Sequence, residues 1–143
     1  MQILFSFMHV EAKKNSLTVK HILLVDKAFF ECPICSKSLD RYIQFVKDNH
    51  LGDRIVCIVC KLGDIREQSR KILILEKKIE GFLKTNEIPF PVLLDQSRLF
   101  DSFCEKCMIA ILLLDGPNKR IDRLEFPLSQ KAWEKIFNGA LNE

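Results

Sequence analysis

The sequence predicts an α/β domain in which a mixed central sheet carries helices on both faces. Short continuous apolar runs alternate with longer segments whose apolar residues recur at helical spacing, and a tight-turn sequence joins the last two runs. Strands joined by a helix run parallel, whereas a tight turn pairs its strands antiparallel. The chain of 143 residues is long enough for one such domain with a hydrophobic core of its own.

The first half of the chain is expected to supply two buried strands and two helices. Residues 20–26 and 54–60 are continuous apolar runs, which are typical of strands covered on both faces. From Pro33 onward the apolar residues recur at helical spacing, until the turn residues of 49–53 end the pattern. Residues 64–86 read as a long amphipathic helix.

The second half is expected to complete the sheet and close the chain with a helix. Residues 89–95 form a short strand that carries proline only at its entrance, and 96–107 form a loop or a turn of helix. The most apolar run, 108–115, is placed centrally in the sheet. After the turn, residues 120–126 alternate like a half-exposed edge strand, and Ser129 is expected to cap the last helix.

Composition excludes some classes of function. The 22 basic and 19 acidic residues give a net charge of +3 without a basic stripe, so a nucleic-acid partner is not indicated. No apolar run approaches the roughly 18 residues that a membrane span needs. Residues 1–19 are interpreted as an N-terminal extension, either a remnant of a signal segment or a first strand, ahead of a domain at 20–143. The histidines, among them His21, are expected at the surface or at element edges.

All six cysteines occur as C-x-x-C pairs, and the first pair lies where a strand meets a helix. The dipole and free N–H groups of a helix start favour a thiolate at Cys32, and Cys35, nearly one turn further on, can close a disulfide with it. Cys32 would then attack a disulfide and Cys35 would resolve the mixed disulfide. The plain alternative is two partly buried thiols. Pro33 and Ile34, between the cysteines, are expected to contact substrate.

The segment LLVDKAFFECPIC resembles the thioredoxin superfamily, and the outline of residues 20–140 is most similar to the TlpA/ResA-like thiol-disulfide oxidoreductases. The resemblance implies that Asp26, six residues before Cys32, is a buried acid that accepts the proton of Cys35. It also implies a monomer that exchanges disulfides with protein thiols, an upstream electron donor, and no bound cofactor because the electrons travel on the sulfurs. A bacterial cell envelope setting, on the extracytoplasmic side, is implied too, with the cytoplasm as the alternative.

The sequence departs from the family pattern at two places. Glu31 replaces the tryptophan that usually precedes the first cysteine, and its charge would oppose a thiolate at Cys32. Met108 and Ile109 stand where the family's substrate-binding loop has a cis-proline. By the resemblance these two residues are expected to contact the substrate, but without that proline.

The other cysteine pairs allow several interpretations. The resemblance places Cys107 close to Cys32 and Cys104 further out, so that Cys104 and Cys107 would form either a second redox pair that relays electrons or a bridge that staples the loop. The alternative is a buried Cys107 and a surface Cys104 without function. Cys57 and Cys60 lie three apart in a strand and point to opposite faces, so core packing is expected for both.

Two rival functions remain open from the sequence. Cys32, Cys35, Cys104 and Cys107 provide the four thiolates of a tetrahedral structural zinc site, although these pairs adjoin a regular helix and a regular strand rather than short turns. A thioredoxin-like binding module that no longer catalyses exchange is the second rival. The absent cis-proline favours that module, whereas the CPIC sequence opposes it.

Overall fold

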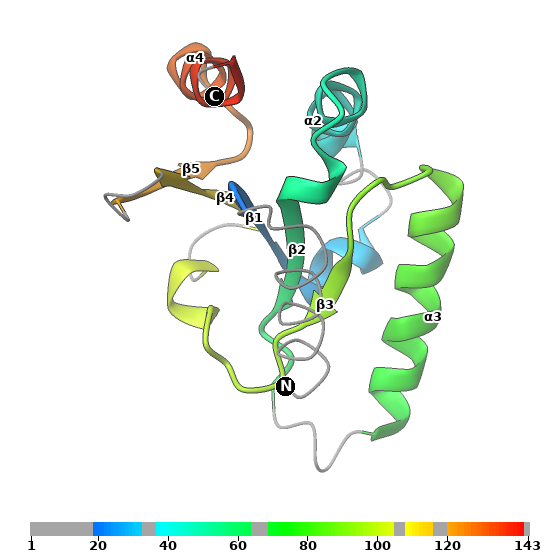
Figure 1. Ribbon diagram of the computed structural model, residues 1–143. Coiled ribbons are helices and arrows are strands. Elements are labelled where there is room, and N and C mark those ends of the chain that lie inside the picture. Colours follow the sequence, from blue (N-terminus) through cyan, green and yellow to red (C-terminus); the bar gives the residue numbers. More distant parts are fainter. Residues whose placement is uncertain (1–18, 33–36, 64–68, 105–107, 116–119, 142–143) are drawn as a thin grey trace.

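The computed structural model describes residues 19–32, 37–63, 69–104, 108–115 and 120–141. Within these residues, one five-stranded sheet with the order β3-β2-β1-β4-β5 forms the centre of the molecule (Figure 1). The strands are β1 (His21–Asp26), β2 (Ile55–Cys60), β3 (Val92–Leu94), β4 (Ile109–Asp115) and β5 (Arg120–Glu125).

The sheet is mixed, as predicted. β1, β2 and β3 run parallel to one another, whereas β4 is antiparallel to both of its neighbours, β1 and β5. The most apolar strand, β4, is therefore interior, but β1 occupies the middle of the order. An apolar sequence indicates that a strand is covered on both faces, and β1, β2 and β4 share that property. Composition alone therefore does not tell which of these strands lies in the middle of the sheet.

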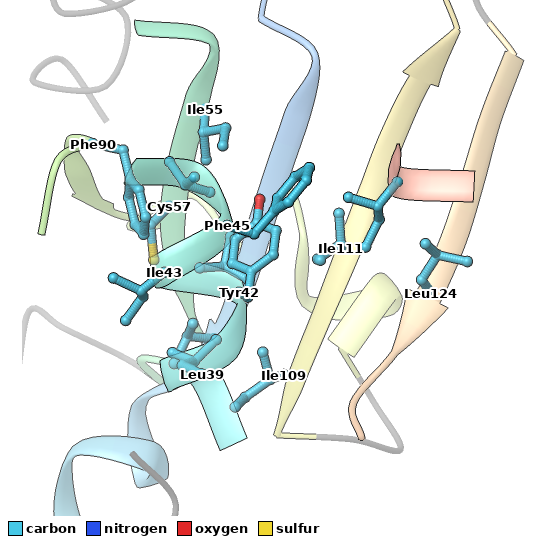
Figure 2. Packing of buried hydrophobic residues seen from close by; sticks show 14 of the residues in the cluster. Leu39, Tyr42, Ile43, Phe45, Ile55, Cys57, Phe90, Ile109, Ile111 and Leu124 are labelled. Carbon is cyan, nitrogen blue, oxygen red and sulfur yellow. The ribbon is translucent and has the colours of Figure 1, made fainter. Parts of the chain in front are cut away.

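The three α-helices of the described residues pack on one face of the sheet. They are α2 (Lys37–Asp48), α3 (Ser69–Thr85) and α4 (Gln130–Leu141). α2 and α4 enclose the main core together with inward residues of β1, β2, β4 and β5, and Figure 2 shows Tyr42 and Phe45 of α2 beside Ile111, with Leu124 beyond it. α3 covers the same face nearer to β3, where Ile79 packs with Val59. This helix-covered side carries most of the buried apolar surface and thus most of the hydrophobic stabilisation.

The opposite face is covered by a short 3-10 helix, η4 (Asp101–Cys104), and the segment leading to it. Phe100, Phe103 and Cys104 pack there against strand residues whose side chains point to this face of the sheet, among them Leu24 and Leu112. Helical segments therefore lie on both faces, as predicted, although in the described part of the chain the second face has only this single turn.

Local contacts explain where several elements end. Ser129 caps α4 as predicted, because its Oγ accepts a hydrogen bond of 3.1 Å from the Ala132 N–H. Position 52, after α2, has no room for a side chain, because a Cβ there would lie 2.4 Å from the Pro89 carbonyl oxygen. Glycine is therefore the residue that fits at this position. No helix in the described residues is long and apolar enough to cross a membrane.

His21 lies at an element edge as expected, because it is the first residue of β1, but it is buried rather than at the surface. Only 3% of the residue is exposed, and its Nδ1 lies 3.0 Å from the hydroxyl of the buried Tyr42 on α2. Burial, with a smaller contribution from the charge of Lys20, lowers the pKa of His21 to about 4. The imidazole is therefore neutral at physiological pH and belongs to the core.

Candidate functional site

The candidate site begins where β1 ends and the chain turns toward Cys32. A 3-10 helix, η1 (Lys27–Glu31), lies between them, which the sequence pattern did not predict. The Asp26 carboxylate caps this helix by accepting a hydrogen bond of 2.9 Å from the Ala28 N–H. At its other end the Cys32 N–H donates to the Phe29 carbonyl at 3.2 Å, and the Phe29 side chain is buried in the main core. Cys32 is thus held by a turn that is anchored at both ends.

Cys32 is half-buried and its sulfur is disulfide-bonded. Pro33, Ile34 and Cys35 lie outside the described residues, so the pairing of Cys32 with Cys35 and the expected substrate contacts of Pro33 and Ile34 stay predictions.

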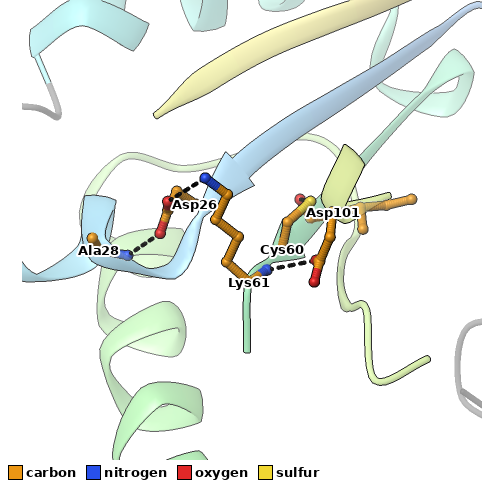
Figure 3. A network of polar contacts seen from close by, with 6 residues as sticks. Asp26, Ala28, Cys60, Lys61 and Asp101 are labelled. Atoms are coloured by element: carbon orange, nitrogen blue, oxygen red, sulfur yellow. Dashed lines mark hydrogen bonds and ion pairs between the residues drawn. The ribbon is translucent and has the colours of Figure 1, made fainter. Parts of the chain in front are cut away.

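Asp26 lies beside a lysine that the sequence interpretation missed. Lys61 follows β2 directly, and its Nζ lies 3.7 Å from Asp26 Oδ2, as Figure 3 shows. The carboxylate is 17% exposed, so it is less buried than predicted. The signal for Lys61 was present in the pattern, because adjacent parallel strands end at the same edge of a sheet and Asp26 is paired in register with Cys60.

Lys61 also connects this edge to the opposite face of the sheet. Its backbone N–H donates to Asp101 Oδ1 of η4 at 3.0 Å (Figure 3). Its backbone has a φ of 59°, in the left-handed region that non-glycine residues adopt infrequently. One residue therefore joins Asp26, on the Cys32 side, to η4.

Glu31 is exposed and points toward α3. Its carboxylate lies 3.8 Å from the Nζ of Lys78, and both side chains are well exposed, so the ion pair is weak. The negative charge that the sequence places next to Cys32 is thus partly offset by a cation from α3.

The two residues at the position without a cis-proline have different environments. The Met108 carbonyl accepts a hydrogen bond of 2.8 Å from the Asp26 N–H, which places this loop end next to Asp26. The Met108 side chain is exposed, whereas that of Ile109 is buried in the main core. Of this predicted substrate-contacting pair, only Met108 presents a side chain at the surface.

A hollow of about 310 Å³ lies between η1 and α3, next to Cys32 in the sequence. Its walls combine apolar side chains with three lysines and a single carboxylate. Ile74 of α3 is an apolar wall residue that is half exposed to solvent. The lining residues are Lys27, Glu31, Leu62, Lys71, Ile72, Ile74, Leu75 and Lys78.

The remaining described cysteines, Cys57, Cys60 and Cys104, are buried thiols that form no disulfide. Cys57 packs in the main core and Cys60 on the opposite face, which confirms the expected core packing on two sides of β2. Burial raises the pKa of the Cys57 thiol. Cys104 was expected further out or at the surface, but it is fully buried because η4 packs flat against the sheet. Cys107 lies outside the described residues, so its closeness to Cys32 and its pairing with Cys104 remain untested.

The four-cysteine zinc site finds no support in the described part of the chain. There, no group of three or more His, Cys, Asp or Glu side chains could hold a metal ion. Two of the four proposed ligands, Cys35 and Cys107, lie outside it.

Comparison with known proteins shows the fold. No family model and no curated protein matches the chain. The structure is similar to the solution structure of a protein provisionally assigned as a thioredoxin, from Neisseria meningitidis, with a TM-score of 0.60 and 15% sequence identity over 91% of this chain and 81% of that chain. The chain therefore has a thioredoxin-like fold, as the resemblance implied.

Proposed function

We propose that this protein is a thiol-disulfide oxidoreductase that uses Cys32 and Cys35 and belongs to the thioredoxin superfamily, in its TlpA/ResA-like branch. The observation that carries the proposal is the position of Cys32. The fold of this chain is thioredoxin-like. In it, Cys32 follows the central strand, β1, through a turn that Asp26 caps. Its sulfur already takes part in a disulfide.

The proposed reaction consists of two exchange steps. The Cys32 thiolate attacks a disulfide of the partner protein, which forms a mixed disulfide and releases one partner thiolate. The Cys35 thiolate then attacks the sulfur of Cys32 and releases the second partner thiolate. The partner gains two electrons and the protein keeps a Cys32–Cys35 disulfide, which an upstream thiol donor reduces. Sulfur carries both electrons, so the reaction needs no bound cofactor.

Asp26 is proposed to accept the proton of Cys35 in the second step. The Nζ of Lys61 lies 3.7 Å from the Asp26 carboxylate, and the Ala28 N–H holds Oδ1 in place. Both contacts leave a partly exposed carboxylate at the end of β1, from which a proton can pass to solvent.

The partner is proposed to dock in the hollow between η1 and α3. An exchange partner must bring an extended segment to Cys32, and this hollow begins one residue away, at Glu31. Its apolar walls and its excess of lysine over carboxylate suit a segment with both acidic and apolar side chains. Met108 is proposed to contact the same segment from the other side, without the proline of the family.

Two further parts of the proposal rest on the resemblance alone. The TlpA/ResA-like outline favours the extracytoplasmic side of a bacterial cell envelope, and fractionation of the native host tests this location. A relay between Cys32 and a Cys104–Cys107 pair would need a disulfide between Cys104 and Cys107, whereas within the described residues Cys104 has Cys60 as its neighbour.

Reduction of insulin disulfides by dithiothreitol tests the proposed activity. The wild type is expected to accelerate the reaction, Cys32→Ser to abolish the acceleration, and Cys35→Ser to accumulate a mixed disulfide that is visible on a non-reducing gel. Cys57→Ser is the matched control, because it removes a core thiol that takes no part. Unchanged acceleration by Cys32→Ser would refute the proposal. Protection of Cys32 and Cys35 from alkylation until a chelator is added would favour the zinc protein instead.

A further inference from the structure

Cys60 and Cys104 meet on the face of the sheet opposite to α2 and α4. Cys60 is the last residue of β2 and Cys104 the last of η4, so 43 residues of sequence lie between them. Both residues are fully buried, and they share one apolar cluster with Ala110 and Leu112. The Cys104 side chain lies within hydrogen-bonding reach of the Cys60 thiol. The Cys60 sulfur also donates to the Ile58 carbonyl oxygen at 3.6 Å.

The position of this thiol pair is fixed from several sides. Asp95, after β3, is buried, and its two carboxylate oxygens accept hydrogen bonds from the Leu99 and Phe100 N–H groups at 3.0 and 2.8 Å. These bonds hold the turn that leads into η4. Asp101 holds η4 to the N–H of Lys61, the residue that follows Cys60. Hydrogen bonds in the turn before η4 and at the first residue of η4 thus hold Cys104 next to Cys60. Two apolar residues that were only packed in a core would not need these bonds.

We propose that Cys60 and Cys104 are a second redox couple, a buried dithiol that closes into a disulfide between β2 and η4. The oxidant is a small-molecule disulfide such as oxidised glutathione. This couple is distinct from Cys32 and Cys35, and the proposal does not depend on their chemistry.

Cys104 is the cysteine that reacts first. Cys60 belongs to β2, an interior strand of the sheet, and is paired in register with Asp26 of β1, whereas Cys104 ends a single turn that local opening can lift from the face. The Cys104 thiolate attacks one sulfur of the small disulfide and releases one thiolate. The Cys60 thiolate then attacks the Cys104 sulfur, which forms the Cys60–Cys104 bond and releases the second thiolate. The two protein thiols lose two electrons and two protons, and the two released thiolates take them up as thiols.

The surroundings make this couple slow to react. Its hydrogen bond with Cys104, its burial and the nearby Asp95 and Asp101 carboxylates raise the pKa of the Cys60 thiol. The Cys60 sulfur therefore stays protonated in the closed structure, and exchange waits for opening of η4. Once formed, the bond would tie η4 to the strand end that carries Lys61, next to Asp26.

Disulfide mapping of the full-length protein tests the proposal. The protein is equilibrated in mixtures of reduced and oxidised glutathione, quenched in acid and alkylated after denaturation. Mass spectrometry then reports the state of each cysteine and the linked peptides. We expect Cys60 and Cys104 to lose alkylation together as the buffer becomes oxidising, with a peptide pair 2 Da lighter than the two thiol peptides, the mass of the two hydrogens lost.

Matched variants and a second readout distinguish the outcomes. In Cys60→Ser, Cys104 should lose its partner and the linked peptide should disappear. In Cys57→Ser, which removes an equally buried thiol on the other face, the linked peptide should remain. Two results would overturn the inference. One is that Cys60 and Cys104 stay thiols in a buffer that fully oxidises Cys32, and the other is a Cys104–Cys107 link in the wild type. The wild-type result needs no variant to fold, and Cys32 in the same spectra reports separately on the proposed oxidoreductase.

Discussion

The buried His21 makes the stability of the fold depend on pH in a way that can be calculated. The imidazole is 3% exposed, and its Nδ1 lies 3.0 Å from the Tyr42 hydroxyl. Burial and then Lys20 lower its pKa from 6.5 to about 4 in the folded protein. In the unfolded chain the group keeps its ordinary pKa of about 6.5. Below that pH the unfolded chain therefore binds a proton that the folded protein does not.

The sign and size of the effect follow from proton linkage. Because the folded pKa is lowered, the contribution of His21 is fully present above the unfolded pKa and is lost as the pH falls through the interval between 6.5 and about 4. These two pKa values give a loss in the free energy of unfolding of about 2 kcal/mol at pH 5 and about 3 kcal/mol at pH 4. Either value is a large part of the roughly 5–15 kcal/mol that stabilises an ordinary domain.

Urea unfolding of the wild type and His21→Gln at several pH values between 7 and 4 isolates this contribution. The glutamine keeps a polar group that can bond to Tyr42 but does not titrate, and carboxylates that titrate in both proteins cancel in the difference. The wild type should lose about 3 kcal/mol relative to the variant between pH 7 and pH 4. A difference in unfolding free energy that stays constant across this range would refute the buried, neutral histidine.

Three further predictions concern the core and the region around Cys32. Tyr42→Phe leaves the buried imidazole nitrogen without its partner and should lower the free energy of unfolding by about 1–3 kcal/mol, measured by urea unfolding at pH 7; an unchanged value would mean that the hydrogen bond contributes nothing. Glu31→Gln should raise the alkylation rate of reduced Cys32 about twofold, and Lys78→Gln should lower it, because both exposed charges act on the Cys32 thiolate through solvent. Salt at about 1 M should abolish both effects. Effects that persist in salt would contradict this cause. Lys71→Glu, in the hollow, should raise the KM for reduction of a peptide disulfide with acidic and apolar side chains. Lys84→Glu, on the same helix but outside the hollow, should leave this KM unchanged. Equal effects of the two variants would argue against docking of the partner in the hollow.

Much of the fold could be predicted because single segments carry its signal. The run that became β2 is apolar at every position, and all six of its residues are buried. The apolar spacing of α2 predicted Leu39, Tyr42, Ile43, Phe45 and Val46 as its inward face, and all five are buried. In both cases the period of the chain itself determines which residues turn inward.

The parts that could not be predicted depend on contacts between distant segments. His21 stands beside a lysine at the edge of a strand and reads as a surface residue, but α2 brings Tyr42 over it. Nothing within β2 indicates that Cys60 meets Cys104, because the turn held by Asp95 decides that contact. η1 was missed for a local reason: its five residues are too few to show a period, and its cap by Asp26 needs only one carboxylate.

The order of the strands also affects how the molecule meets other copies of itself. The two edges of the described sheet are β3 and β5. β3 has only three residues, which is too short a template for another chain to extend the sheet by backbone pairing. β5 is longer, but it carries Asp122, Arg123 and Glu125, and bringing a second copy alongside would require these charges to lose water. Both edges therefore resist strand-to-strand aggregation, including under the oxidising conditions in which the cysteines exchange.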